Sequence, residues 1–149
     1  MIYKEECRDL FSVSEEYYLA HCISADFGMG RGIVVEFNNR FDMKNKLISK
    51  YPNYLRKWQG SDPYDGDCIL EGRVLNLVTK ERYYMKPTYE NIEKALLIMA
   101  ILCTEKGIQK VAMPVIGCGL DKLDWGRVSE IIKDTFRNVD IEILVCKVA

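Results

Sequence analysis

The chain has 149 residues, of which 48% are hydrophobic and 29% are charged, and its formal net charge is −1. This length and hydrophobic content suffice for a sizeable core, and we expect residues 1–149 to form a single domain. A net charge near zero excludes a broad basic surface for nucleic acid, because that binding mode needs an excess of Lys and Arg.

Short apolar runs alternate with stretches of helical periodicity along the chain, a pattern typical of an α/β fold. Several of the runs are apolar almost throughout, as buried strands of a sheet tend to be. The predicted strands are Ile2–Lys4, Tyr18–Ile23, Cys68–Leu70, Val74–Thr79, Lys110–Met113 and Ile141–Val145. We therefore expect a three-layer α/β/α domain with a mixed central sheet.

Helical signal runs over residues 33–51, with a break predicted near Asn38 and Asn39, and residues 52–66 are predicted to form a long exposed loop. The clearest helix spans residues 89–105, with Thr88 as its N-cap and Gly107 as its end. A last helix is predicted over residues 125–137, capped by Asp124.

Residues 110–121 run from a short strand into a Gly-x-Gly loop that ends at Asp121. Gly117 and Gly119 let the backbone turn sharply and approach a ligand, and successive N–H groups in such a turn form an anion-binding nest. The dipole of the helix that follows adds to this site. The loop therefore predicts a phosphate site. Because a carboxylate is a poor phosphate ligand, Asp121 indicates chemistry or sugar contact.

Three other segments fit a nucleotide-sized ligand beyond the carboxyl ends of the strands. Residues 22–32 leave a strand and pass through three glycines, although neither glycine loop has the GxGxxG spacing of a dinucleotide-binding fold. Lys80 ends a buried strand, a place where most lysines are solvated charges. Asp9 follows the first strand, where an aspartate commonly begins a turn.

The cysteines and the single histidine do not predict a metal site. The six cysteines include no CxxC pair, and we expect reduced thiols. His21 lies inside an apolar strand without a ligand partner at suitable spacing, so we expect a structural histidine in the core. We expect no metal and no cofactor.

Five segments together resemble a macrodomain. They are residues 19–24 (LAHCIS), 29–33 (MGRGI), 78–80 (VTK), 86–91 (KPTYEN) and 113–125 (MPVIGCGLDKLDW). They are similar in particular to the branch that contains terminal ADP-ribose protein glycohydrolase and its bacterial relatives. The resemblance covers nearly the whole chain, and it implies that ADP-ribose binds at the carboxyl edge of the sheet.

The resemblance also implies a role for each candidate residue. Lys80 would be the nucleophile and Asp121 the acid/base residue. Asp9 would hold the adenine amino group, and Val148 would close the adenine side. The other implied ligand-binding residues are Leu10, Ile23, Ser24, Met29, Gly30, Arg31, Gly32, Thr79, Pro114, Val115, Ile116, Gly117, Cys118, Gly119 and Leu120. Among these, residues 117–120 would wrap the diphosphate, and Ser24 and residues 30–32 would flank the phosphate and the distal ribose.

In the implied reaction, Lys80 attacks the anomeric carbon of the distal ribose and expels the modified group, and Asp121 then helps water to release ADP-ribose. The attacking amine must first lose its proton. Desolvation by substrate and the charge of Arg82, on the same strand face if the strand continues, would favour the neutral amine. Alternatively, Asp121 would take the proton, and the sequence leaves both accounts open.

Three substrate classes remain open: esters on glutamate or aspartate side chains of proteins, O-acyl-ADP-ribose, and ADP-ribosylated bases in DNA. The net charge favours the esters slightly, although Lys44, Lys46, Arg56 and Lys57 could hold DNA locally. We expect a monomeric, cytoplasmic protein without membrane contact, since no apolar run is long enough to span a bilayer and the acidic start is unlike a secretory signal.

The main alternative is a non-catalytic reader module, which has no need for the pair Lys80 and Asp121. A Mg²⁺-dependent phosphohydrolase is disfavoured because the sequence lacks a carboxylate cluster. One departure from the macrodomain pattern is Arg8, at a position where these proteins generally carry glycine, and it predicts an altered turn near adenine.

Overall fold

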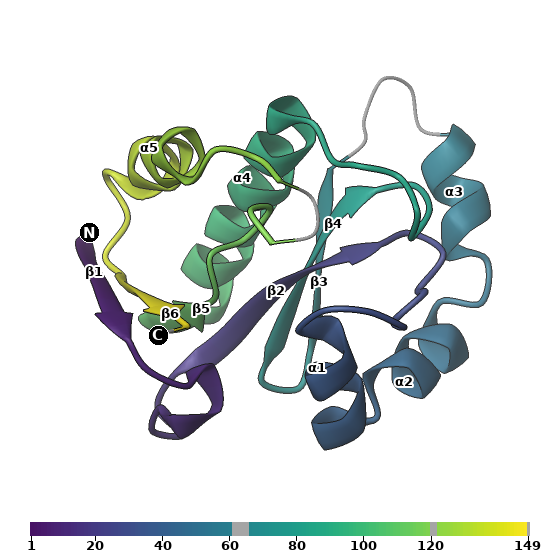
Figure 1. Ribbon diagram of the computed structural model, residues 1–149, viewed down its shortest axis with the longest axis horizontal. Helices are drawn as coiled ribbons and strands as arrows, with labels where there is room; N and C mark the ends of the chain where they lie inside the picture. The colour runs from purple at the N-terminus through teal and green to yellow at the C-terminus, as the bar shows by residue number, and fades with distance from the viewer. Residues whose placement is uncertain (61–65, 120–121, 149) are drawn as a thin grey trace.

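The computed structural model describes residues 1–60, 66–119 and 122–148, and Figure 1 shows a central sheet between two layers of helices. In chain order the elements are β1 (Ile2–Cys7), the 3-10 helix η1 (Leu10–Ser12), β2 (Tyr18–Ser24), α1 (Val34–Phe41), α2 (Met43–Lys50), α3 (Tyr54–Gly60), β3 (Asp67–Glu71), β4 (Val74–Lys80), α4 (Tyr89–Lys106), β5 (Lys110–Met113), α5 (Trp125–Phe136) and β6 (Glu142–Lys147). This arrangement confirms the predicted α/β/α fold. No helix within these ranges is both long enough and apolar enough to cross a membrane.

The six strands form one mixed sheet in the order β1-β6-β5-β2-β4-β3. Along the row β1-β6-β5-β2-β4, each strand pairs in parallel with its neighbour. The last strand, β3, pairs antiparallel with β4. Gly72 forms the tight β3–β4 turn with a φ of 58°, in the left-handed region that glycine favours. The carboxyl ends of five neighbouring strands therefore meet at one edge of the sheet, where a ligand site is expected.

Two separate apolar clusters hold the layers together. Helices α4 and α5 cover one face of the sheet through Leu96, Met99, Ile132 and Phe136, all fully buried. Helices α1, α2 and α3 cover the opposite face, through Phe37, Met43, Leu47 and Trp58. Alternate residues of β5 serve the two clusters, with Val111 and Met113 in the first and Ala112 in the second, as the period of a strand requires.

The helix caps were predicted correctly. The Thr88 hydroxyl accepts a hydrogen bond from the Asn91 N–H at 3.1 Å, and Gly107 ends α4 with a φ of 68°. Asp124 caps α5 by accepting from the Arg127 N–H at 3.3 Å. These residues have short-range partners, which is why local sequence signals identified them.

Two expectations about the segment after β2 were wrong. The break between α1 and α2 lies at Asp42, which has a φ of 52°, because Asn38 stays helical and its side chain accepts from the Lys44 N–H at 3.0 Å. Part of the expected loop over residues 52–66 is helix α3. Its Trp58 is buried, and the Tyr54 ring stacks on Phe27 with a centroid distance of 5.3 Å. These tertiary contacts outweigh the turn-forming residues around them.

His21 is a fully buried structural residue, as predicted. Its Nε2–H donates to the Asn76 Oδ1 at 2.6 Å, and the Asn76 amide in turn donates to the Ile69 carbonyl at 3.1 Å. The imidazole stacks on the Phe37 ring with a centroid distance of 3.8 Å. Burial lowers the pKa of His21 from 6.5 to about 4, against the smaller opposite effect of the Asn76 hydrogen bond. The neutral ring is therefore part of the folded core.

This pKa predicts an acid-sensitive core. The unfolded chain binds a proton at His21 below about pH 6.5, whereas the folded chain does so only near about pH 4, so stability falls as the pH drops through that window. The shift corresponds to about 3 kcal/mol of unfolding free energy between about pH 7 and pH 4. Urea unfolding at both pH values measures the change in unfolding free energy for the native chain and for His21→Gln, whose side chain cannot titrate. The native chain should lose more unfolding free energy than the variant, by this amount. Equal pH dependence of the two proteins would contradict the assignment.

Candidate active site

A cavity of about 1010 Å³ opens at the carboxyl ends of β2, β4, β5 and β6. The predicted site residues that line it are Ile23, Ser24, Gly30, Arg31, Gly32, Lys80, Pro114, Val115, Ile116, Gly117, Cys118, Gly119 and Val148. Asp9, Leu10, Met29 and Thr79 are not among the residues that line it, and Leu10, Met29 and Thr79 are buried. Leu120 and Asp121 lie outside the described residues.

The strand order sets how far the cavity extends along the edge of the sheet. From β6, whose Lys147 lines the cavity, to β4, which ends at Lys80, there are three steps between neighbouring strands. At about 4.8 Å a step this gives about 14 Å, so the cavity is elongated across the strand ends. Asp9, which follows β1 one step further out, does not line it.

The glycine loop after β5 is held in a conformation that only glycine suits. Gly117 has a φ of 73°, and a Cβ there would lie 2.8 Å from the Ile92 Cδ1 and 3.2 Å from the Leu123 Cδ1. The Leu123 N–H donates to the Gly117 carbonyl at 2.8 Å, and the Cys118 N–H donates to the Val115 carbonyl at 3.4 Å. The loop therefore closes on itself and on α4, with its backbone along the cavity.

Ser24 lies where the pairing of β2 with β4 shifts by one residue, so that it stands opposite Lys80. It is almost fully buried, and its hydroxyl donates to the Asp26 Oδ1 at 2.5 Å. The same carboxylate oxygen accepts from the Gly28 N–H at 3.0 Å. Because the Ser24 proton is committed to Asp26, its oxygen can accept a hydrogen bond from a ligand hydroxyl.

Lys80 ends β4 with a half-buried side chain that lines the cavity. The Ala25 N–H donates to the Lys80 carbonyl at 2.9 Å, and the Asn91 amide of α4 donates to the Thr79 carbonyl at 3.3 Å. Hydrogen bonds from the loop after β2 and from α4 therefore fix the two peptide groups that flank Lys80. A fixed backbone lets the lysine amine be positioned against one particular part of a bound ligand.

Arg82 was expected to share a strand face with Lys80 if the strand continued past Lys80. It does not, because β4 ends at Lys80. The chain turns immediately, with the Met85 N–H donating to the Arg82 carbonyl at 3.0 Å. The Arg82 guanidinium instead lies 3.6 Å from the Glu81 carboxylate. Arg82 is not among the residues that line the cavity, so its charge is directed elsewhere.

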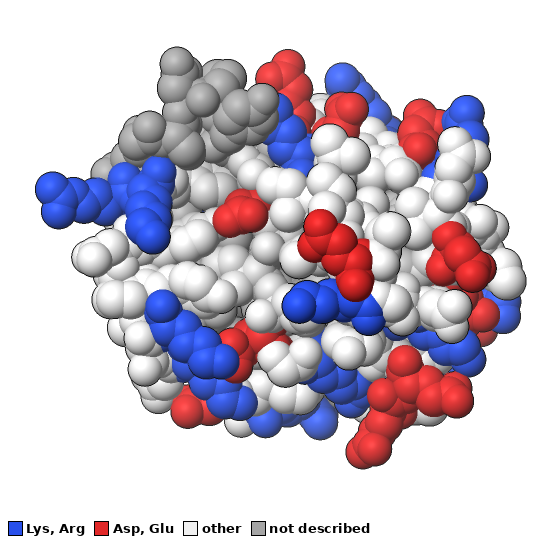
Figure 2. All heavy atoms as spheres, turned by 180° about the vertical axis from the view of Figure 1, so that it is seen from behind, with Lys and Arg blue, Asp and Glu red and all other residues white. Residues whose placement is uncertain are grey.

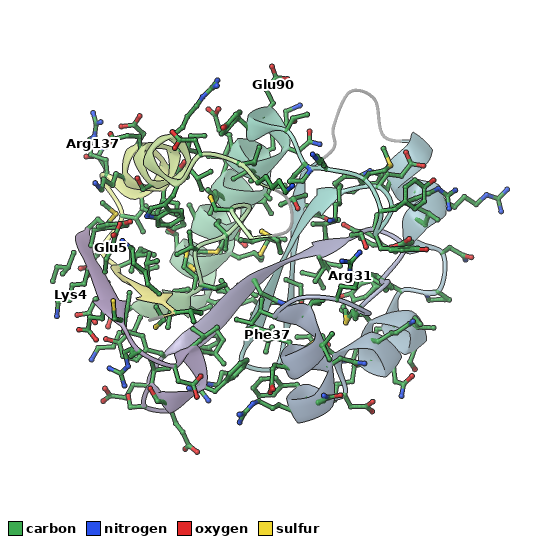
Figure 3. All side chains as sticks on the ribbon, viewed as in Figure 1. Lys4, Glu5, Arg31, Phe37, Glu90 and Arg137 are labelled. Atoms are coloured by element: carbon green, nitrogen blue, oxygen red, sulfur yellow. The ribbon has the colours of Figure 1, made fainter. Side chains whose placement is uncertain are left out.

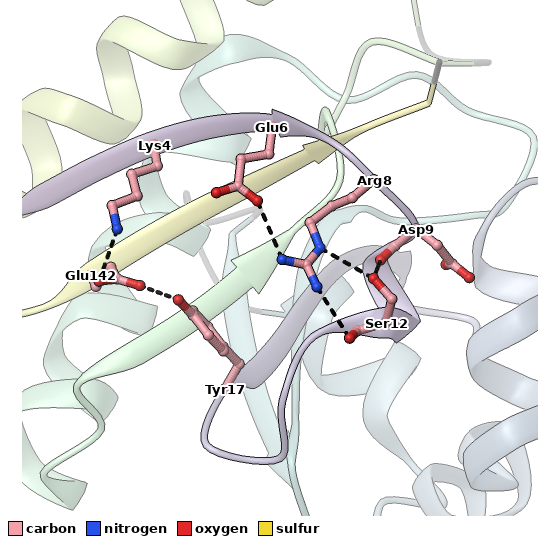
Figure 4. Close-up of polar contacts among 7 residues, drawn as sticks. All are labelled: Lys4, Glu6, Arg8, Asp9, Ser12, Tyr17 and Glu142. Atoms are coloured by element: carbon pink, nitrogen blue, oxygen red, sulfur yellow. Dashed lines mark hydrogen bonds and ion pairs between the residues drawn. The ribbon is translucent and has the colours of Figure 1, made fainter.

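Asp9 caps the short helix η1, accepting from the Phe11 N–H at 3.0 Å. Figure 4 shows the Arg8 guanidinium turned away from the Asp9 carboxylate, toward Glu6 at 3.3 Å and toward Ser12. The Arg8 N–H donates to the Lys147 carbonyl at 3.1 Å, and Arg8 is not among the described residues with a positive φ. The backbone there accepts a side chain without strain, so the turn does not require glycine.

The end of the cavity beside β6 has a support that the sequence did not reveal. Glu5 of β1 accepts from the Trp125 Nε1–H at 3.2 Å and lies 2.6 Å from the Lys147 Nζ. The hydrogen bond from Lys147 is the main cause that lowers the pKa of Glu5. Both Trp125 and Lys147 line the cavity. Glu5 is 120 positions from Trp125 in sequence, so no local pattern predicts this contact.

The sequence assigned no ligand contact to other residues that line the cavity: Cys22, Gly28, Ile33, Val34, Tyr83, Tyr84, Met85, Lys86 and Cys146. Cys22 and Gly28 nevertheless lie in the predicted segment 22–32, and Ile33 and Lys86 lie in segments that resemble a macrodomain. The segment from Tyr83 to Lys86 follows Lys80 closely, and its two adjacent tyrosines are the signal that could have found it. The remaining residues flank predicted ones and carry no chemical signature of their own.

The charge around the cavity is positive. Its described lining includes Arg31, Lys80, Lys86 and Lys147 and contains no Asp or Glu; Arg31 lies between β2 and α1 in Figure 3. By contrast, Lys and Arg are interspersed with Asp and Glu on the face drawn in Figure 2. Across residues 1–60, 66–119 and 122–148, no group of His, Cys, Asp and Glu is arranged to hold a metal ion. The charge of this described lining favours an anionic ligand.

A three-layer α/β/α domain with a basic, elongated cavity at the carboxyl ends of parallel strands defines a nucleotide-binding class of protein. Residues 70–132 match the family model described as "Macro domain". The chain is 38% identical to human ADP-ribose glycohydrolase OARD1 over 141 residues, which are 92% of this chain and 86% of that protein. The chain therefore belongs to the macrodomain family.

Solved structures show the same fold. The macrodomain of Mycobacterium tuberculosis DarG matches with a TM-score of 0.79 at 20% identity, covering 99% of this chain and 98% of that one. A structure of Thermosipho africanus DarTG in complex with ADP-ribose matches with a TM-score of 0.67 at 17% identity, covering 93% of this chain and 39% of that one. At these identities the likenesses show the fold.

Proposed function

We propose that this protein is an ADP-ribosyl hydrolase that binds ADP-ribose along the cavity and releases it from modified targets through a covalent intermediate on Lys80. The observation that carries the proposal is Lys80 itself, a half-buried lysine fixed by its backbone at one end of a basic cavity. The similarity to human ADP-ribose glycohydrolase OARD1 over 92% of the chain supports this class of reaction.

The arrangement of the cavity suits ADP-ribose along its whole length. The glycine loop around Gly117 offers backbone to the diphosphate, and the adenosine would extend toward Val148 at the end of β6. The distal ribose would then lie at the end formed by Ser24 and Lys80, which stand opposite each other in neighbouring strands. Ser24 can accept a hydrogen bond from a ribose hydroxyl there, and the exposed Arg31 would complement a phosphate.

The proposed reaction has two steps. The neutral Lys80 amine attacks the anomeric carbon of the distal ribose, and the bond to the modified group breaks with its electron pair leaving on that group. The lysine adduct opens to a Schiff base, which water then hydrolyses to free ADP-ribose and the original amine. We assign proton transfer in both steps to Asp121, on the macrodomain resemblance, since this residue lies outside the described part of the chain.

The competing function is a reader module that binds ADP-ribosylated targets without cleaving them. The glycine loop would serve both functions equally well, so it does not discriminate between them. A reader, however, has no use for a lysine whose backbone is held by α4 and by Ala25, the residue after β2, beside the sugar end of the site. This contrast favours catalysis.

A release assay tests the proposal. Purified protein is incubated, with and without EDTA, with three substrates: a glutamate-linked ADP-ribosyl peptide, O-acetyl-ADP-ribose and a base-linked ADP-ribosyl oligonucleotide. We expect free ADP-ribose from at least one substrate, at a rate that EDTA does not change. Tight binding of ADP-ribose with no release from any of the three would establish the reader function instead.

A further inference from the structure

Two neighbouring tyrosines lie exposed at the reacting end of the cavity. Tyr83 and Tyr84 come three and four residues after Lys80 and line the same cavity, yet 61% and 69% of their respective surfaces are exposed. Their rings meet edge to face, with centroids 5.4 Å apart and an interplanar angle of 89°. Two large aromatic surfaces left in water beside a site are typical of contact with a ligand.

The backbone under these rings is fixed by the loop that follows β2. The Tyr83 N–H donates to the Asp26 Oδ2 at 3.1 Å, while the other oxygen of that carboxylate accepts from Ser24 and Gly28. A Cβ on Gly28 would lie 2.8 Å from the Tyr83 Cβ, so only glycine allows this close approach. Asp26 thus ties the tyrosine segment to Ser24, the residue opposite Lys80.

We infer that Tyr83 and Tyr84 form the subsite for the leaving group, and that this group is a nucleobase in a single strand of nucleic acid. The inference rests on the proposed function, which puts the anomeric carbon at Lys80 and so directs the leaving group toward the tyrosines. A base offers a planar ring that can stack on tyrosine, whereas the ester of an acidic side chain offers none. Two exposed aromatic rings therefore favour a base as the leaving group over the ester of an acidic side chain.

The charges beside the tyrosines fit a short stretch of phosphodiester. Lys86 is exposed and lines the cavity two residues beyond Tyr84, and the described lining contains no acidic residue. A net charge of −1 does not oppose this, because a strand gripped at one base relies on stacking more than on a broad basic surface. The subsite thus reverses the slight preference for protein or small-molecule esters that net charge alone suggests.

The test compares Tyr84→Ala and Tyr84→Phe with the native chain on the three substrates of the release assay, all of which share the ADP-ribose half. Base–aromatic stacking is worth about 1–3 kcal/mol, so Tyr84→Ala should lower kcat/KM on the oligonucleotide about tenfold or more relative to O-acetyl-ADP-ribose. Tyr84→Phe should keep the native ratio, because its ring still stacks. Tyr51→Ala, which removes an exposed tyrosine that is not among the residues lining the cavity, is the matched control.

Three results would overturn the inference: an unchanged ratio, an equal fall on all three substrates, or a selective fall on the glutamate-linked peptide. If the native chain releases ADP-ribose from no substrate, the proposed function fails separately. In that case binding tests the subsite, which predicts that the native chain binds the modified oligonucleotide more tightly than free ADP-ribose. Loss of this difference in affinity in Tyr84→Ala would support the subsite, and its persistence would overturn it.

Discussion

Lys80→Ala is expected to lower turnover of every substrate linked through the anomeric carbon by at least about a thousandfold, while the Kd for ADP-ribose changes less than about threefold. The variant removes the only atom proposed to bond to the anomeric carbon, whereas diphosphate and adenosine contacts lie elsewhere in the cavity. Single-turnover kinetics with saturating enzyme would measure the chemical step, and calorimetry with ADP-ribose would measure the affinity.

Lys80→Arg is the control for this prediction, because guanidinium keeps the positive charge but stays protonated and cannot attack carbon. It should be as inactive as Lys80→Ala while binding ADP-ribose normally. Activity retained in Lys80→Arg would assign Lys80 an electrostatic role. Activity retained in both variants would exclude a lysine nucleophile.

Gly117→Ala is expected to weaken ADP-ribose binding by at least about tenfold. The new Cβ meets the Ile92 and Leu123 side chains at 2.8 and 3.2 Å, and a left-handed φ of 73° disfavours alanine by about 1–2 kcal/mol. The loop can relieve both strains only by moving its backbone, which is the surface offered to the diphosphate. Calorimetry with ADP-ribose measures the loss directly.

Gly72→Ala separates backbone strain from an effect on the site. Gly72 also has a left-handed φ, 58°, but a Cβ there would meet nothing within 4 Å, and the residue does not line the cavity. It should lower stability by a similar strain energy and leave the affinity for ADP-ribose unchanged. Equal affinity losses in the two variants, or none in Gly117→Ala, would contradict the role given to the glycine loop.

The sequence predicted the parts of the fold that depend on local signals. The apolar run ending at Met113, the capping residues Thr88 and Asp124 and the closing Gly107 each act through neighbours in the chain, and each was found. Helix α3 was missed because its stability comes from Trp58 in a core shared with distant strands. Periodicity within a short segment cannot report such contacts.

The candidate site shows the same division. The glycines and Lys80 were marked by their place at strand ends, and they line one cavity. Asp26 lies in the predicted segment 22–32 but was not named as a site residue, because its function depends on a hydrogen bond from Tyr83, 57 positions later in the chain. Glu5 was missed for the same reason. Residues that position a site through distant partners carry no local pattern, so only the structure identifies them.

The covalent intermediate on Lys80 is the central claim, and chemical trapping tests it most directly. Native protein and Asp121→Ala would be incubated with a cleavable ADP-ribosyl substrate and sodium cyanoborohydride, which reduces a Schiff base to a stable amine. Peptide mass spectrometry would then locate the adduct. We predict one ADP-ribose on Lys80, with more of it in Asp121→Ala. Substrate turnover by the native protein with no adduct on Lys80 would contradict the mechanism.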